Sequence, residues 1–208
     1  MIIQGTPEWH EARLGKVTAS RIADLMAKTK SGVAASRGNY EAQLIAERMT
    51  GTFEEGFKSA AMERGNEVEA EARAFYEFLH NVTVEEVGFV DHPTIAMSGA
   101  SPDGLVGEEG LFECKCPNTK THIETLLGGS IKGVYLKQMQ WQMACTERLW
   151  CDFVSYDPRM PESLQMFVQR VERDDNVITE IQQEVGHFLD DLKFKINKLE
   201  ALIQKAAA

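Results

Sequence analysis

The sequence predicts an α+β fold, an α/β sandwich in which helices flank a central mixed β-sheet. Short alternating segments rich in β-branched and aromatic residues gather between residues 82 and 115 and again between 149 and 171. Helical stretches precede and separate these segments, and a long helix of heptad character ends the chain. With 208 residues the chain can build one substantial core, so we expect a single domain over residues 1–208.

The first part of the chain is predicted to be helical. Thr6 and Pro7 have the residue types of an N-cap and a first helical position, and Gly15 marks a stop. Gly51 closes a later helix in the same way. The expected elements are a helix over 7–14, a helix capped by Thr18-Ala19-Ser20, a small polar loop over 29–38, and helices over 39–49 and 59–80.

The strands are expected in the second part of the chain, with two helices between them. The predicted elements are strands over 82–90 and 95–97, a hairpin around 103–115, helices over 119–127 and 132–146, and strands over 149–156 and 164–171.

The last helix is expected over about 174–203 and spans about 45 Å at the usual rise per residue. Its apolar residues recur from Ile178 to Leu202 at heptad spacing. We expect the first half to pack on the core. The second half either projects toward another subunit or folds back along the domain.

The composition is that of a soluble globular protein, with 43% hydrophobic and 26% charged residues. No apolar run approaches the roughly 18 residues of a membrane span, and the N-terminus lacks the features of a signal peptide, so we expect a cytoplasmic protein. The net charge of −10 argues against an indiscriminate nucleic-acid binder. Basic residues nevertheless outnumber acidic ones in 1–40 and 115–137, which predicts a basic groove within an acidic exterior.

The segment from Asp103 to Lys115 carries the most chemical information. Asp103 and Glu113 offer hard oxygen ligands for a divalent cation, and Lys115 places an amine beside them. Because side chains alternate along a strand, Glu113 and Lys115 share one face while Phe112 and Cys114 point to the core. This is the minimal constellation of a metal-dependent phosphodiesterase. The alternative is a surface hairpin with a cross-strand ion pair.

The turn of this hairpin decides whether Asp103 joins the charged face. If the loop is Glu108–Gly110, Gly107 pairs with Leu111. Asp103 then lies opposite Lys115 and diagonal to the glutamate, close enough for one metal site.

The cysteines are predicted to be buried thiols. A cytosolic chain of this length does not need a disulfide framework, and Cys-x-Cys has no second close pair with which to form a zinc or iron–sulfur site. The four cysteines are Cys114, Cys116, Cys145 and Cys151.

Several further motifs follow one another along most of the chain. They are Arg13-Leu14-Gly15 with Thr18-Ala19-Ser20, Arg64-Gly65-x-x-x-Glu69, Ser101-Pro102-Asp103-Gly104-Leu105, Glu113-Cys114-Lys115-Cys116-Pro117, Leu127-Gly128-Gly129, Tyr135-x-x-Gln138-x-Gln140 and Tyr156-Asp157-Pro158-Arg159-Met160. In this order they resemble the phage lambda-type 5′→3′ exonuclease family, the viral recombinase nucleases of the PD-(D/E)xK superfamily. The resemblance implies a restriction-endonuclease-like sheet.

The resemblance also implies a metal site. Asp103, Glu113 and the backbone carbonyl of Cys114 would bind Mg²⁺, with two ions per site and Mn²⁺ as a substitute. Glu69 would orient water or complete a second cation site. Its alternative is a solvated position on an acid-rich helix.

Three more residues have implied roles near the reacting phosphate. Lys115 would position or deprotonate the attacking water and offset transition-state charge, while the metals contribute most to catalysis. Gln138 would contact water or phosphate, and its alternative is an ordinary helix-face amide. Ser101 matches a position near the metal, or it serves the turn before the proline.

Arg13 and Ser20 resemble the family's 5′-phosphate pocket. A guanidinium holds phosphate through two parallel hydrogen bonds, and Ser20 lies at a helix N-terminus that favours anions. The alternatives are a surface ion pair for Arg13 and a plain N-cap for Ser20. Lys120 stands in a segment that lacks the family's arginine, and whether it takes over that DNA-binding role is open.

The implied activity is a metal-dependent 5′→3′ exonuclease on double-stranded DNA ends carrying a 5′-phosphate. It would release 5′-mononucleotides and leave 3′ overhangs for phage-type recombination by single-strand annealing. A homotrimeric ring, an annealing protein as partner and a phage or prophage origin come with the resemblance. The alternatives are a sequence-specific endonuclease of the same core, expected to be dimeric, and a non-catalytic DNA-end-binding recombination scaffold.

Overall fold

Strands from both clusters of the sequence join one five-stranded mixed sheet with the order β10-β9-β8-β7-β4. The central strands β8 and β9 run parallel, and the other neighbours pair antiparallel. The strands are β4 (Val84–Glu85), β7 (Gly104–Val106), β8 (Gly110–Lys115), β9 (Trp150–Tyr156) and β10 (Met166–Glu172). Three short strands form a second sheet of order β1-β6-β5: β1 (Val17–Thr18), β5 (Val90–Asp91) and β6 (Ser98–Ala100).

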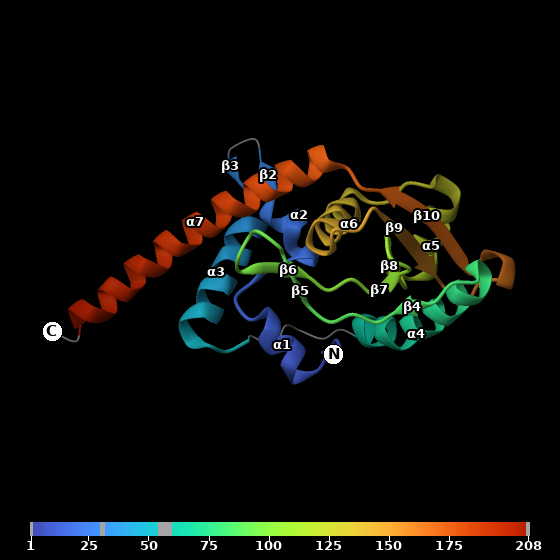
Figure 1. The fold of residues 1–208 in the computed structure, drawn as a ribbon, viewed down its shortest axis with the longest axis horizontal. Helices are drawn as coiled ribbons and strands as arrows, with labels where there is room; N and C mark the ends of the chain where they lie inside the picture. The colour runs from blue at the N-terminus through green and yellow to red at the C-terminus, as the bar shows by residue number, and fades with distance from the viewer. Residues whose placement is uncertain (1, 30–31, 54–59, 207–208) are drawn as a thin grey trace.

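This computed structural model describes residues 2–29, 32–53 and 60–206, without the side chains of residues 33 and 60–67. The helices are α1 (Pro7–Arg13), α2 (Ile22–Leu25), α3 (Ala35–Thr50), α4 (Ala60–His80), α5 (Thr119–Gly128), α6 (Gly133–Thr146) and α7 (Asp175–Ala206), with 3₁₀ turns at Ala19–Arg21 and Glu162–Leu164. In the described part of the chain, no helix combines the length and apolar character that crossing a bilayer requires. The predicted α+β fold is confirmed (Figure 1).

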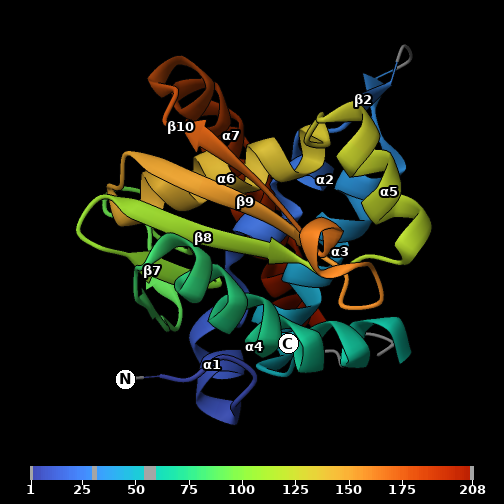
Figure 2. The same ribbon diagram turned by 90° about the vertical axis from the view of Figure 1, so that its right-hand side faces the viewer.

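The main sheet lies between α4 and α6 (Figure 2). On the α4 face, Phe112 and Cys114 of β8 pack with Tyr76 in one apolar cluster. On the α6 face, Leu111 of β8 packs with Met139 in another. The predicted alternation along β8 is therefore correct, and Glu113 and Lys115 share the α6 face with Leu111.

The predicted register of the hairpin was wrong. Gly104 pairs with Phe112, Leu105 with Leu111 and Val106 with Gly110, so the loop is Gly107–Glu109 and not Glu108–Gly110. Gly107 takes the positive φ of +54°. Because the pairing partners shift by two residues, each side chain still lies on the face of the sheet that was predicted. The register places Asp103 across from Glu113, where Lys115 was expected.

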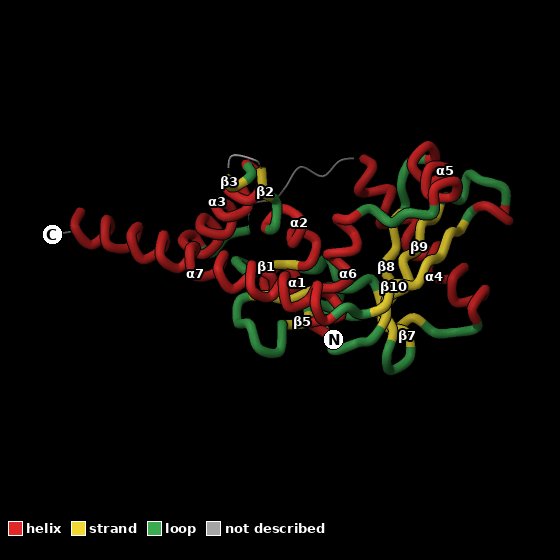
Figure 3. Tube along the Cα trace, turned by 90° about the horizontal axis from the view of Figure 1, so that it is seen from above, coloured by secondary structure: helices red, strands yellow, loops and turns green. Residues whose placement is uncertain are grey.

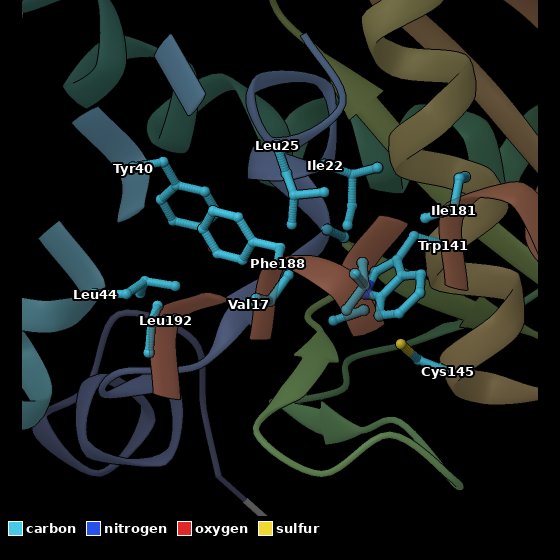
Figure 4. Close-up of a cluster of buried hydrophobic side chains, with 13 residues drawn as sticks. Val17, Ile22, Leu25, Tyr40, Leu44, Trp141, Cys145, Ile181, Phe188 and Leu192 are labelled. Atoms are coloured by element: carbon cyan, nitrogen blue, oxygen red, sulfur yellow. The ribbon is translucent and has the colours of Figure 1, made fainter. Parts of the chain in front are cut away.

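The first half of α7 packs on a core formed by α2, α3 and α6 (Figure 4). Tyr40 and Phe188 stack there with ring centroids 5.6 Å apart. The buried residues of α7 end at Leu192, and the helix then extends away from the sheets (Figures 1 and 3). Leu202 and Ile203 are 61% and 59% exposed. The prediction that the first half packs is confirmed.

Several local predictions need correction. The polar segment 29–38 contains strand β3 (Gly32–Val33), which pairs with β2 (Lys28–Thr29), and the start of α3. The helix after Thr18-Ala19-Ser20 is only a 3₁₀ turn and one α turn. The strand predicted over 82–90 is split between two sheets, and the one predicted over 95–97 forms at Ser98–Ala100. The β-propensity of residues 82–97 indicated extended chain, but pairing with neighbouring strands determines where each strand begins and ends.

Candidate functional site

Asp103, Glu113 and Lys115 come together where β7 begins and β8 ends. The register puts Asp103 across from Glu113, and Oδ2 of Asp103 accepts a hydrogen bond from the backbone N–H of Cys114 at 2.8 Å. The ammonium group of Lys115 donates to Oε1 of Glu113. The hairpin therefore brings two carboxylates and one amine to a common point.

Helix α6 fixes the Glu113 side chain from above the sheet. Nε2 of Gln138 donates to Oε1 of Glu113 at 2.5 Å, and Nε2 of Gln142 donates to Oε2 at 2.6 Å. Glu113 is fully buried, so its charge depends on these donors and on Lys115. The sequence-predicted Gln138 thus belongs to the site through Glu113.

Gln142 is a residue of this site that the sequence reasoning missed. It is fully buried, and in the described part of the chain its Oε1 has no hydrogen-bond partner. An unsatisfied buried acceptor costs about 1–3 kcal/mol. The available signal was its spacing, because residues four apart lie on one face of a helix and Gln142 follows Gln138 by four.

Burial and neighbouring charge shift the protonation of this cluster. Burial raises the pKa of Asp103 well above its usual range, and the charge of Glu113 raises it further against the opposing effect of Lys115. Burial alone would lower the pKa of Lys115, but Glu113 and Asp103 outweigh it and the pKa is raised. Lys115 therefore keeps its proton at neutral pH and acts as a donor in this arrangement.

Glu69 approaches the same cluster from α4. It lines a cavity of about 550 Å³ together with Trp9, Arg73 and Asp103. Burial raises the pKa of Glu69; Lys115 opposes this shift, whereas Glu113 reinforces it. The side chain of Arg64, from the same motif, lies outside the described residues.

The donor set of this cluster suits a hard divalent cation. Asp103, Glu113 and Glu69 are acidic, and the charge of Glu113 raises the pKa of both other groups, with Lys115 as a nearby cation. A bound cation would relieve that repulsion, and carboxylate oxygens are the ligands that Mg²⁺ and Mn²⁺ prefer. Among the described residues, no three His, Cys, Asp or Glu side chains gather closely enough to form a metal-binding group alone.

Ser101 and the N-terminal segment hold the start of the Asp103 turn. Trp9 of α1 donates from Nε1 to Oγ of Ser101 at 2.9 Å. Gln4 donates from Nε2 to the carbonyl of Pro102 at 2.7 Å. Neither Trp9 nor Gln4 was predicted as a site residue, because no local pattern links residues so far apart in the chain.

Arg13 and Ser20, predicted as a phosphate pocket, line one cavity of about 450 Å³. Ser20 is exposed, and the guanidinium carbon of Arg13 lies 3.8 Å from the centre of the Trp9 ring. Burial lowers the pKa of Arg13, against the opposing influence of Tyr40 and Glu47. Nε of Arg13 is buried and has no hydrogen-bond partner among the described residues.

Much of the predicted basic groove is neutralised within the chain. Acidic residues, most of them from later segments, pair with several N-terminal cations, so the local charge surplus does not translate fully into free positive surface. The pairs are Lys16–Asp91 at 2.6 Å, Arg21–Asp24 at 2.7 Å, Lys28–Glu184 at 2.7 Å and Arg37–Glu184 at 3.6 Å. Lys120, on α5, is 87% exposed and lies 3.9 Å from Glu124.

The cysteines are thiols, as predicted. None of them forms a disulfide in the part of the chain that the structure describes, and Cys114, Cys145 and Cys151 are buried. Cys116 is partly buried, with its sulfur 3.8 Å from that of Cys114.

The fold and the Asp-Glu-Lys cluster define a nuclease of the PD-(D/E)xK class. The sequence model of the YqaJ-like viral recombinase domain matches residues 8–149. The chain therefore belongs to the YqaJ-like viral recombinase family. No curated protein matches the chain significantly.

Solved structures agree with this assignment. The alkaline exonuclease LHK-Exo from Laribacter hongkongensis is 57% identical, with a TM-score of 0.91, and the alignment covers 97% of this chain and 100% of that one. The same values hold for LHK-Exo in complex with dAMP. A phage-related exonuclease from Haemophilus somnus 129PT shares the fold, with a TM-score of 0.68 at 13% identity over 88% of this chain and 96% of that one.

Proposed function

We propose that this nuclease is a Mg²⁺-dependent 5′→3′ exonuclease acting on the ends of double-stranded DNA. The observation that carries the proposal is the cluster of Asp103, Lys115 and the fully buried Glu113 on paired strands. Full-length similarity to an alkaline exonuclease supports the same activity. The complex of that relative with dAMP supports a deoxynucleoside 5′-monophosphate as the released product.

Asp103 and Glu113 would hold the cation, and Mn²⁺ would substitute for Mg²⁺. The N–H and C=O of one strand residue point to the same neighbour, so the Cys114 carbonyl faces the side from which Asp103 approaches its N–H. It is the further oxygen ligand that we propose. Glu69 would complete a second cation position. When bound, the cations supply electrostatic stabilisation of the attacking and leaving oxygens.

The residues of the chain orient the reacting groups. A water molecule loses a proton as its oxygen forms a bond to phosphorus. The bond from phosphorus to O3′ of the terminal nucleotide breaks, and O3′ takes up a proton, so the number of protons is unchanged. Lys115, which keeps its proton, would donate to the phosphate oxygens as charge develops. Gln138, fixed against Glu113, would contact water or phosphate beside it.

Arg13 and Ser20 would bind the terminal 5′-phosphate. The buried Nε of Arg13 offers a free donor to an anion entering the cavity that both residues line. Arg13 stacks on Trp9, and Trp9 donates to Ser101 two residues before Asp103. Each cut leaves a new 5′-phosphate on the shortened strand, which can enter the pocket again. Ser101 would help to hold the metal-site turn, and Lys120, exposed on α5, would contact the DNA backbone.

We propose a homotrimeric ring around the duplex and a single-strand annealing protein that receives the exposed 3′ strand, in the cytoplasm of a host cell. The exposed apolar residues at the end of α7 support a role in assembly or partner binding. A three-fold ring would use a heterologous interface.

Digestion of linear duplexes labelled separately at each terminus tests the proposal, with circular duplex as the control and with and without a chelator. We expect loss of the 5′ label first, no digestion of the circle and no activity with the chelator. Cleavage of the circle would support a sequence-specific endonuclease instead. Binding of ends without any cleavage would support a recombination scaffold.

A further inference from the structure

Gln142 has a burial and bonding pattern that packing does not explain. It is fully buried on α6 between Met139 and Met143, which pack in an apolar cluster. Its Nε2 donates to Oε2 of Glu113 at 2.6 Å, while its Oε1 has no partner in the described chain. A methionine would fill this place without an unsatisfied carbonyl, so the gain from the amide must lie at Glu113.

The acceptor positions of Glu113 show what that gain is. An ionised carboxylate has about four lone-pair positions, two on each oxygen. Lys115 and Gln138 both donate to Oε1, and Gln142 donates to Oε2. One position on Oε2 is left. The carboxylate can therefore offer one oxygen to a cation without losing any of its three donors.

We propose that Gln142 is a positioning residue that orients Glu113 so that it presents Oε2 alone to a divalent cation. This inference rests on the proposed function, because it presupposes that Glu113 is a cation ligand. Partners that orient metal ligands typically change metal affinity about 10–100-fold when they are removed. Gln142 acts through Glu113 and is not itself required to touch the cation or the DNA.

Gln140, on the same helix, provides a matched control. Its Nε2 donates to the carbonyl of Glu172 at 2.8 Å, and its Oε1 accepts from the backbone N–H of Asp174 at 2.9 Å. Both ends of this amide are satisfied, and they join α6 to the connection between β10 and α7. Gln140 is therefore a structural residue, and its loss should affect unfolding rather than cation binding.

The experiment compares wild type, Gln142→Met, Gln142→Leu and Gln140→Met. Mn²⁺ alone is titrated into metal-free, DNA-free protein and followed by electron paramagnetic resonance, and urea unfolding is measured in chelator. We expect the Kd for Mn²⁺ to rise about 10-fold or more in both Gln142 variants, with the urea midpoint nearly unchanged. Gln140→Met should show the reverse, a lower urea midpoint and an unchanged Kd.

The outcomes separate this inference from the proposed function. Wild-type protein that neither binds Mn²⁺ nor digests DNA would defeat the proposed function. Wild-type protein that does both, with Gln142 variants of equal Mn²⁺ affinity, would defeat only the role of Gln142. Failure of both Gln142 variants to fold would also defeat it, since Gln142 would then be structural.

Discussion

Replacing Lys115 by methionine is the sharpest test of the cluster, because the structure links one ammonium group to both stability and cation binding. Lys115 is 27% exposed and Glu113 is 0% exposed, so water cannot solvate the Glu113 carboxylate when the Lys115 ammonium group is removed. Breaking a buried ion pair by deleting one partner costs about 3–5 kcal/mol. Gln138 and Gln142 still donate to Glu113, and we therefore expect the lower end, about 3 kcal/mol.

Divalent cations should reverse much of this loss. In Lys115→Met the carboxylates of Asp103 and Glu113 lose their opposing charge, so a cation that binds the folded state has more repulsion to relieve. A cation at 100 times its Kd stabilises the folded state by about 2.7 kcal/mol. DNA digestion should not recover, because the variant lacks the charged donor at the phosphate.

The assay is urea unfolding of Lys115→Met and wild type, in chelator and in Mg²⁺ or Mn²⁺. Lys120→Met is the control, because Lys120 is 87% exposed and its removal should change the unfolding free energy by less than about 0.5 kcal/mol. A loss below about 1 kcal/mol in chelator would contradict the buried pair. Equal stabilisation of variant and wild type by the cation would refute the idea that the cation replaces the ammonium charge.

Asp103→Asn should abolish Mg²⁺-dependent digestion, measured on labelled linear duplex, because it removes a proposed cation ligand. The pKa of Asp103 is raised in the folded state, so its contribution to stability falls as pH rises above the unfolded pKa. The variant should therefore equal or exceed wild type in stability at neutral pH, and the difference should vanish in acid. Lower stability of the variant at neutral pH would contradict this. Arg13→Ala should slow digestion of 5′-phosphorylated ends more than of 5′-hydroxyl ends, whereas Lys28→Ala, which loses only an exposed pair with Glu184, should affect both equally; equal slowing by Arg13→Ala would remove it from the phosphate pocket. Truncation from Asn197 should leave the core folded, since burial on α7 ends at Leu192, and should weaken oligomerisation in sedimentation or partner binding; an unchanged assembly and partner affinity would exclude that role.

The central hairpin shows how far the sequence alone could lead. Alternation along residues 111–115 was enough to predict which side chains share a face. The loop was misplaced because Gly107 and Gly110 can both adopt positive φ. Trp150 decides between them, since a Cβ at Gly110 would lie 2.1 Å from its ring, which requires glycine within the strand. That contact comes from a strand distant in sequence, so no local pattern could reveal it.

The residues of the candidate site could likewise be predicted only in part from the sequence. Strand alternation and a hairpin predict that Asp103, Glu113 and Lys115 lie together. Gln138 was placed at the site only by the family resemblance. Gln142 and Trp9 were missed, since an amide or an indole gains meaning only from the group it contacts. The basic groove was overestimated because sequence counts of charge do not show which cations pair across the fold, as Lys28 does with Glu184.

The arrangement around Glu113 is difficult to explain as a stabilising feature. A buried carboxylate beside a second acid whose pKa is raised, held by an amide whose own carbonyl is unsatisfied, is less favourable than apolar packing of equal volume. The surrounding residues Leu111, Met139 and Met143 show that this layer of the fold accepts such packing. A fold usually departs from its stabilising pattern where function requires it. The cost concentrates on the one carboxylate that accepts from Lys115, Gln138 and Gln142 together, and this marks Glu113 as the residue around which the site is built.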